Sequence, residues 1–157
     1  MNWLPVVAPP LLMVLGGMLT WIIKSKIEEL RSTEEKLRGE RSKIYAQILE
    51  PFMRLFTDAK GRGPDQAIRT FASKDFKRAA FELGLFASDQ VVRAYNDLIT
   101  HVHRAEAAGT QDPKEIMRLW GKLRLEIRKS LGNKNTKLDE YDMLRGMITD
   151  IDKLESQ

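Results

Sequence analysis

The longest apolar stretch of the sequence lies near its start, where residues 3–23 contain no charged side chain. About 20 apolar residues are enough for a helix to cross the hydrocarbon core of a bilayer. Trp3 and Trp21 stand at the two ends of the stretch, as interfacial tryptophans do in membrane proteins. The pattern therefore predicts a transmembrane anchor over residues 1–23, with the lipid bilayer as its partner.

The basic residues near this stretch, Lys24, Lys26 and Arg31, all follow it. By the positive-inside rule the protein is then single-pass, with its N-terminus outside and its C-terminal domain in the cytoplasm. A cleaved signal peptide would carry its positive charge before the apolar run. A buried core helix is seldom apolar on every side. Both are kept as alternatives to the anchor.

Small residues predict that the anchor packs against copies of itself. Gly16 and Thr20 are four positions apart and Gly17 lies beside them, so two helix backbones can approach closely on this face. Met13, one turn earlier, completes the predicted packing set. The alternative is that glycine is simply commoner in membrane-spanning helices than in soluble ones.

A different pattern occupies residues 24–50, where seam residues recur at alternating spacings of three and four, as in a coiled coil. The seam consists of Ile27, Leu30, Glu34, Leu37, Arg41, Ile44 and Ile48. Its polar members lower stability but can fix the register and the number of helices. The segment predicts a stalk helix that assembles several chains, or else one amphipathic helix that folds back onto its own domain.

Residues 51–157 predict a cytosolic helical domain. Pro51 is expected to end or kink the stalk helix. Residues 81–86 alternate like a strand but also fit a helix, and a helix is favoured because no partner strand is visible. The predicted fold is all-α: an N-terminal transmembrane helix continues into a stalk helix, and a bundle of about five helices follows.

Three capping signals place helices in this domain. Ser88 is a suitable N-cap for a helix over residues 89–107. Asp112, followed by Pro113, begins another helix, and Gly132 is expected to end it. Asp139 is expected to cap a last helix. Its predicted apolar stripe is Leu144, Met147, Ile148, Ile151 and Leu154.

Charge is spread unevenly along the chain, whose net charge is +4. Residues 112–137 hold eight basic and three acidic side chains, a balance of +5. Residues 138–157 hold two basic and six acidic side chains, a balance of −4. This asymmetry indicates either a site for an anionic ligand or two elements that attract each other.

The basic stretch contains the candidate ligand-binding residues. They are Arg118, Lys122, Arg124, Arg128, Lys129, Asn133, Lys134, Asn135 and Lys137. Arginine and lysine neutralise phosphates, and asparagine hydrogen-bonds to phosphates or base edges. The pattern favours an oligonucleotide or cyclic nucleotide as ligand. Anionic lipid headgroups, and a solvated face paired with the acidic last helix, are the alternatives.

Nothing in the sequence predicts an enzyme. The chain has no cysteine, so a thiolate zinc site is impossible. His101 and His103 are two positions apart, which directs them to different sides of a helix. No nucleophile-elbow, kinase or zinc-hydrolase motif occurs. We expect no catalytic residue, no metal site and no cofactor.

A resemblance is carried by the phrases ELGLFASDQVVRAYNDL and LRLEIRKSLGNKNTKLDEYDMLRGMITDID. They resemble those of uncharacterised prokaryotic single-span, membrane-anchored helical proteins, over roughly residues 41–153. The layout also resembles small membrane effectors of bacterial antiphage defence, of the Hailong type or the cyclic-oligonucleotide-gated type of type III CRISPR systems. This resemblance implies a homo-oligomer in the bacterial inner membrane, a tetramer by analogy alone, and a partner system with a nucleotidyltransferase.

The sequence thus predicts an oligomeric membrane effector or channel that is gated by a nucleic-acid-like anionic ligand. The alternative is a non-catalytic, membrane-anchored adaptor that holds a protein partner at the inner membrane.

Overall fold

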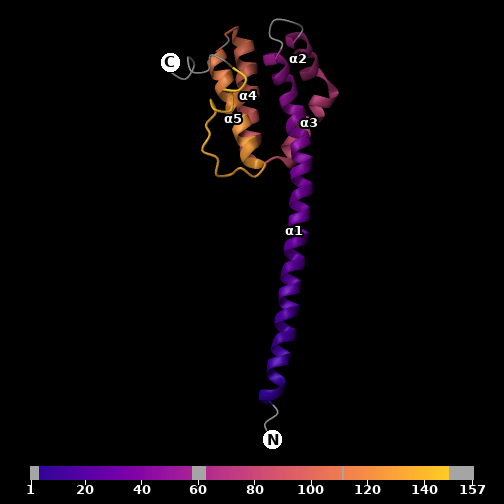
Figure 1. The fold of residues 1–157 in the computed structure, drawn as a ribbon. Helices are drawn as coiled ribbons and strands as arrows, with labels where there is room; N and C mark the ends of the chain where they lie inside the picture. The colour runs from indigo at the N-terminus through magenta and orange to yellow at the C-terminus, as the bar shows by residue number, and fades with distance from the viewer. Residues whose placement is uncertain (1–3, 58–62, 111, 149–157) are drawn as a thin grey trace. The chain divides into compact units, whose positions relative to one another are not determined.

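The computed structural model describes residues 4–57, 63–110 and 112–148, with side chains from Met18 on except Leu19, residues 55–65 and Ala67. This part of the chain forms five α-helices and no strand, which confirms the all-α prediction. The helices are α1 (Leu4–Thr57), α2 (Gly63–Ala72), α3 (Lys74–Phe86), α4 (Asp89–Ala108) and α5 (Pro113–Ser130) (Figure 1).

The chain divides into two units, Met1–Gly39 and Glu40–Gln157, and α1 contributes to both. The described side chains of the first unit are all exposed, among them Trp21 at 71% and Leu30 at 66%. As far as the helices are described, none combines the length and the apolar character needed to cross a membrane. The predicted packing residues of the anchor, except Thr20, lie outside the described side chains.

Helix α1 does not end at Pro51. It continues to Thr57. The predicted boundary between stalk and helical domain, at residue 50, therefore lies inside a helix. Proline removes one backbone donor from a helix interior. Pro51 and Phe52 are both buried at the point where the helix continues past the proline.

The second unit is built around Trp120 of α5, which is fully buried. Phe52 of α1 lies 6.2 Å from Trp120 between ring centroids, and Phe71 meets Phe52 edge to face at 5.1 Å. Helices α4 and α5 lie side by side (Figure 1) and contribute Leu98 and Leu123 to the same cluster. Because burial of large apolar side chains dominates folding free energy, this cluster positions every element of the unit.

Local signals explain where these helices begin and end. Asp112 accepts hydrogen bonds from the amides of Lys114 and Glu115, which confirms its role as N-cap of α5. Ser88 stands at the N-cap of α4 as predicted, although its side chain makes no capping hydrogen bond. Gly109 ends α4 with φ +63°, a left-handed conformation that glycine adopts without strain.

The seam of the stalk segment is divided between the two units. Ile44 and Ile48 belong to the core of the second unit, so this end of α1 packs on its own domain. Ile27, Leu30 and Leu37, in the first unit, are 44%, 66% and 41% exposed. Within its described residues the second unit thus contains five helical segments, but one of them is the end of α1 and none is a helix after Asp139.

The prediction of a last helix from Asp139 is wrong for the described residues, which form successive turns up to Ile148. Asp139 and Asp142 do cap one another, each side chain accepting a hydrogen bond from the other's amide at 2.8 and 3.0 Å. Leu144 is fully buried, so the apolar stripe serves the core without a regular helix. Ile151 and Leu154 lie outside the described residues.

Candidate functional site

The arginines predicted to bind a ligand lie where α5 meets the segment that follows it. Arg118 makes two hydrogen bonds to Glu115, at 2.7 and 2.8 Å, and lies 3.9 Å from the Glu140 carboxylate. The hydrogen bonds from Arg118 lower the pKa of Glu115, and those to Glu115 raise the pKa of Arg118. Arg118 is therefore engaged by carboxylates of its own chain.

Arg124 is the most deeply engaged of these side chains. Its Nη1 donates to the carbonyl oxygen of Met143 and lies 3.1 Å from Sδ of Met147. Its guanidinium also stacks over Trp120, 4.9 Å from the ring centroid. Burial lowers the pKa of Arg124. This arginine fastens the turns after Asp139 to α5, so it does not face a ligand.

The next basic residues show the same tendency. Arg128 donates from Nε to Oγ1 of Thr136 at 3.4 Å, and its carbonyl accepts from both nitrogens of Asn133. Lys122 bridges α5 to α4 through an ion pair with Asp97 at 2.9 Å. These residues are therefore engaged by contacts within the second unit.

Four members of the predicted set remain at the end of α5. Lys129 forms an ion pair with Glu126 at 2.7 Å and is 36% exposed. Lys134, Asn135 and Lys137 are exposed, and their side chains make no hydrogen bond or ion pair with the described part of the chain. The lysines of the predicted stretch that form no ion pair with a described residue, Lys134 and Lys137, therefore lie at this end.

A cleft of about 650 Å³ lies at this end of α5. We call it the Arg41 cleft; it is lined by Arg41, Ser88, Gln90, Glu126, Lys129, Ser130 and Lys134. The lining comes from α1, from the start of α4 and from the end of α5, so three segments far apart in sequence meet there. Three cations face one carboxylate, which gives the cleft a positive balance.

Two hydrogen bonds fix the walls of the Arg41 cleft. Arg41 donates from Nε to the carbonyl oxygen of Phe86 at 2.5 Å, which ties α1 to the end of α3. The hydroxyl of Tyr45, a residue only 2% exposed, lies 2.8 Å from Oγ of Ser130. Arg41 and the end of α5 are consequently held on a packed scaffold, whereas Lys134 lies in the turn after α5.

The start of α4 adds to the character of the cleft. Because the side chain of Ser88 makes no capping hydrogen bond, no side chain caps the first amides of α4 there. Such amides carry partial positive charge and can donate hydrogen bonds to an anion. Together with Lys129 and Lys134 they make the cleft suited to a phosphate or carboxylate. No cysteine or histidine is among its described lining residues.

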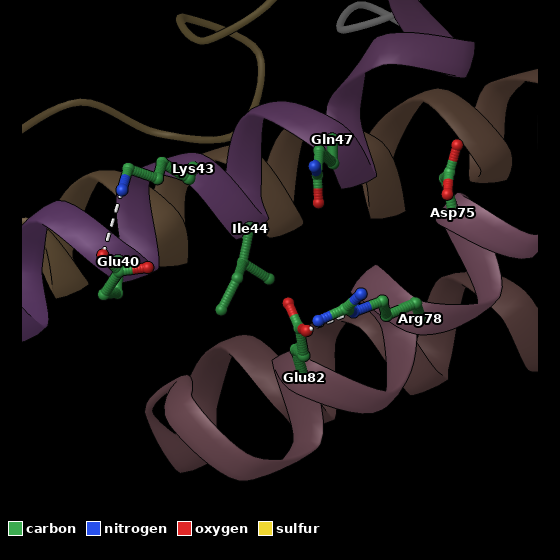
Figure 2. A pocket seen from close by; sticks show the side chains of 7 residues that line it. All are labelled: Glu40, Lys43, Ile44, Gln47, Asp75, Arg78 and Glu82. Carbon is green, nitrogen blue, oxygen red and sulfur yellow. Dashed lines mark hydrogen bonds and ion pairs between the residues drawn. The ribbon is translucent and has the colours of Figure 1, made fainter.

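A second hollow, between α1 and α3, is also polar but is neutralised from within (Figure 2). Its volume is about 320 Å³. Lys43 pairs with Glu40 at 3.0 Å and Arg78 pairs with Glu82 at 2.8 Å, while Asp75 lies at the far end. Its three carboxylates outnumber its two cations, so this groove does not attract anions.

The histidines lie apart from both hollows. His101 is partly buried, and its Nε2 is buried without a hydrogen-bond partner in the described part of the chain; His103 is exposed. Over the residues that the structure describes, no three acidic or histidine side chains converge as a metal site would require.

No family model matches the sequence, and neither a curated protein nor a solved structure is significantly similar to it. The resemblance to antiphage membrane effectors therefore stays a prediction.

Sequence reasoning found the two lysines of the Arg41 cleft but missed its other lining residues. Arg41 carried one usable signal, since it stands at an apolar position of the seam beside the buried Ile44. Ser88 had been assigned to capping alone. Gln90, Glu126 and Ser130 carry no signal in the sequence, because their role depends on three helices meeting.

Proposed function

We propose that the chain is the subunit of an oligomeric membrane effector whose second unit binds an anionic, nucleic-acid-like ligand in the Arg41 cleft. The observation that carries this proposal is the exposed apolar seam of α1. Ile27, Leu30 and Leu37 recur at heptad spacing and are 41–66% exposed. A single chain leaves them in water, and assembly of several copies would bury them.

The anchor is supported by the uncharged run of residues 3–23 and by its place in α1, the same helix that bears the seam. The basic residues that follow this run favour an outer N-terminus and a cytoplasmic second unit. Three apolar layers are few for an isolated coiled coil. We therefore propose that the anchor and the stalk associate together, with Gly16 and Thr20 in the packing face.

The ligand is proposed from the chemistry of the Arg41 cleft. Lys129 and Lys134 supply positive charge, Arg41 supplies a guanidinium and α4 supplies uncapped amides. These groups suit phosphate oxygens, and Asn135 stands beside them for polar contacts. Ligand binding shifts the assembly between two states only by its difference in affinity for them.

The assembly is tested by measuring the protein mass of the full-length chain in mild detergent. The wild type is expected as a discrete assembly of three or more copies, and the variant with Leu30→Ser and Leu37→Ser as smaller species. Ser32→Ala, on the polar side of the same helix, is the matched control and keeps the wild-type mass. A wild-type monomer would exclude a channel, since one span cannot line a pore.

The ligand site is tested with a single-stranded oligonucleotide as probe, by anisotropy at several salt concentrations. Replacing both Lys129 and Lys134 by alanine is expected to weaken binding and to reduce the salt slope by about 0.7 per lost phosphate contact. Lys137→Ala is the matched control outside the cleft. Equal losses in the control and the double variant would place the site elsewhere.

The adaptor is the second candidate, and one observation favours it. Arg118, Arg124 and Arg128 are occupied by contacts within the chain, which leaves less free basic surface than the sequence indicated. An adaptor would keep the anchor and the stalk but bind no oligonucleotide. Absence of oligonucleotide binding in an intact oligomer would favour it.

A further inference from the structure

The outward side of α3 carries large apolar side chains that nothing in the described chain covers. Phe81 is 69% exposed, Leu85 is 63% exposed and Phe86 is 43% exposed. The opposite side of the helix buries Phe76 and Leu83 in the core. A helix with one apolar side in the core and another in water indicates a second binding surface.

This outward side is divided along the helix axis. Its first half is basic, with Lys74, Lys77 and Arg78 exposed; its second half is apolar, with Phe81 and Leu85. At helical spacing, residues 74, 78, 81 and 85 lie on one stripe, with 77 and 84 at its edge. We call these six positions the α3 outer face.

The charge of the α3 outer face is available to a partner. Lys74 and Lys77 form no ion pair with any described residue. Arg78 pairs with Glu82, whose carboxylate raises the pKa of Arg78 through a hydrogen bond. Arg78 lines the groove beside α1 together with Glu82 (Figure 2), so the free charge of the outer face comes from the two lysines. The face itself contains no acidic residue.

We propose that the α3 outer face docks on an anionic phospholipid surface. Phenylalanine and leucine enter the boundary between headgroups and acyl chains, while lysines reach lipid phosphates from the same helix. This inference rests on the proposed anchor, because a body held by a membrane span meets the bilayer at high effective concentration. The bilayer is favoured over a protein partner because apolar and cationic groups lie side by side with no acid among them.

The test uses the full-length chain in vesicles, with a reporter at residue 84. The chain has no cysteine, so Gly84→Cys carries a single environment-sensitive fluorophore. A Cβ at Gly84 meets no atom within 4 Å, and Phe81 and Leu85 stay in place. Ala107→Cys, exposed on α4, is the matched control reporter.

In vesicles that contain phosphatidylglycerol, the reporter at residue 84 is expected to shift to the blue and to be quenched by a nitroxide lipid. The control reporter stays water-like. Phe81→Ser with Leu85→Ser abolishes the signal, and each of Lys74→Gln and Lys77→Gln lowers the ratio of docked to undocked protein about fivefold.

Three results would overturn the docking surface. One is a water-like reporter in anionic vesicles, and another is an equal signal in pure phosphatidylcholine. The third is a blue shift that grows with protein density without nitroxide quenching, which would show that a second copy covers the face. Alkaline carbonate extraction tests the anchor separately. Release by carbonate, with the reporter still quenched by added vesicles at neutral pH, would reject the anchor and keep the docking surface.

Discussion

Gly121 of α5 lies directly against the backbone of Glu140: a Cβ built on Gly121 would overlap the Glu140 carbonyl oxygen. Because no other residue lacks a Cβ, only glycine lets the chain after α5 cross the helix this closely. Arg118 and Arg124 lie on α5 before and after Gly121 and contact the crossing segment. Arg118 forms an ion pair with Glu140, and Arg124 donates to the Met143 carbonyl. The glycine sets the approach and the arginines hold it.

Replacing Gly121 by alanine is therefore expected to lower the free energy of unfolding by about 1–3 kcal/mol, as overpacking does. The measurement is denaturant unfolding of the full-length chain in detergent. Gly84→Ala is the matched control, because Gly84 is helical and its Cβ meets no atom within 4 Å. We expect the control to gain up to about 1 kcal/mol from helix propensity. Equal stability of both variants would contradict the close crossing.

Arg124 offers a second test of the same crossing. Arg124→Gln removes the donor to the Met143 carbonyl and the cation over Trp120, so a loss of about 1–3 kcal/mol is expected. Arg128→Gln removes only the 3.4 Å hydrogen bond to Thr136 and should lose about 0.5 kcal/mol or less. Thermal unfolding of the two variants beside wild type measures the difference. A larger loss for Arg128→Gln would contradict the fastening role of Arg124.

Helix starts were predictable because their signals are local. Asp112 and Pro113 lie next to the amides they serve, and α5 begins where those residues place it. The helix over residues 81–86 was also predicted correctly. The residues that pack against a helix face, in contrast, can lie far away in the sequence. The seam pattern predicted which face of α1 is apolar. It did not predict that Ile44 and Ile48 pack within the same chain.

The last predicted helix failed because tertiary contacts compete for its backbone. In a regular helix the Met143 carbonyl would accept the amide of Met147. Here Arg124 takes that carbonyl, and the Met147 amide bonds to Leu144 at 2.8 Å. Of the predicted apolar stripe, Leu144 is buried, and Asp139 caps a turn and not a helix. A sequence does not show that an arginine from another helix replaces a backbone donor.

The candidate site was only partly predictable for a similar reason. Composition shows that cations are present, but not which of them are paired. Attraction between the basic and acidic stretches was one predicted explanation of the uneven charge, and the ion pair between Arg118 and Glu140 is an attraction between those stretches. Lys129 and Lys134 line a cleft only because Arg41 of α1 and the start of α4 lie beside them.

Glu115 provides a prediction for the pH dependence of stability. Its hydrogen bonds with Arg118 lower its folded-state pKa below the ordinary value of 4.5. The folded chain then stays ionised where the unfolded chain is protonated. The contribution is complete above about pH 4.5 and is lost as the pH falls through the lowered pKa. Since both side chains are about one-third exposed, it is below about 1 kcal/mol.

The measurement compares unfolding of wild type and Glu115→Gln at pH 7 and pH 3. Their difference in stability should shrink at the lower pH, because the unfolded chain is protonated there and the folded carboxylate is closer to its own lowered pKa. Glu106→Gln, exposed on α4, is the control and should show no such change. A difference that stays constant with pH would mean that Glu115 acts through packing and not through charge.

The hydrogen bond between Tyr45 and Ser130 is the most direct link from the core to the Arg41 cleft. Tyr45 is 2% exposed, so its hydroxyl has no water to replace Ser130, and Tyr45→Phe should lower stability by about 1 kcal/mol. A double-mutant cycle with Ser130→Ala should show coupling of about 0.5–1.5 kcal/mol. Because Lys129 precedes Ser130, Tyr45→Phe should also weaken oligonucleotide binding if the core positions the cleft. Coupling near zero, with unchanged binding, would show that α1 and the end of α5 are held by apolar packing alone.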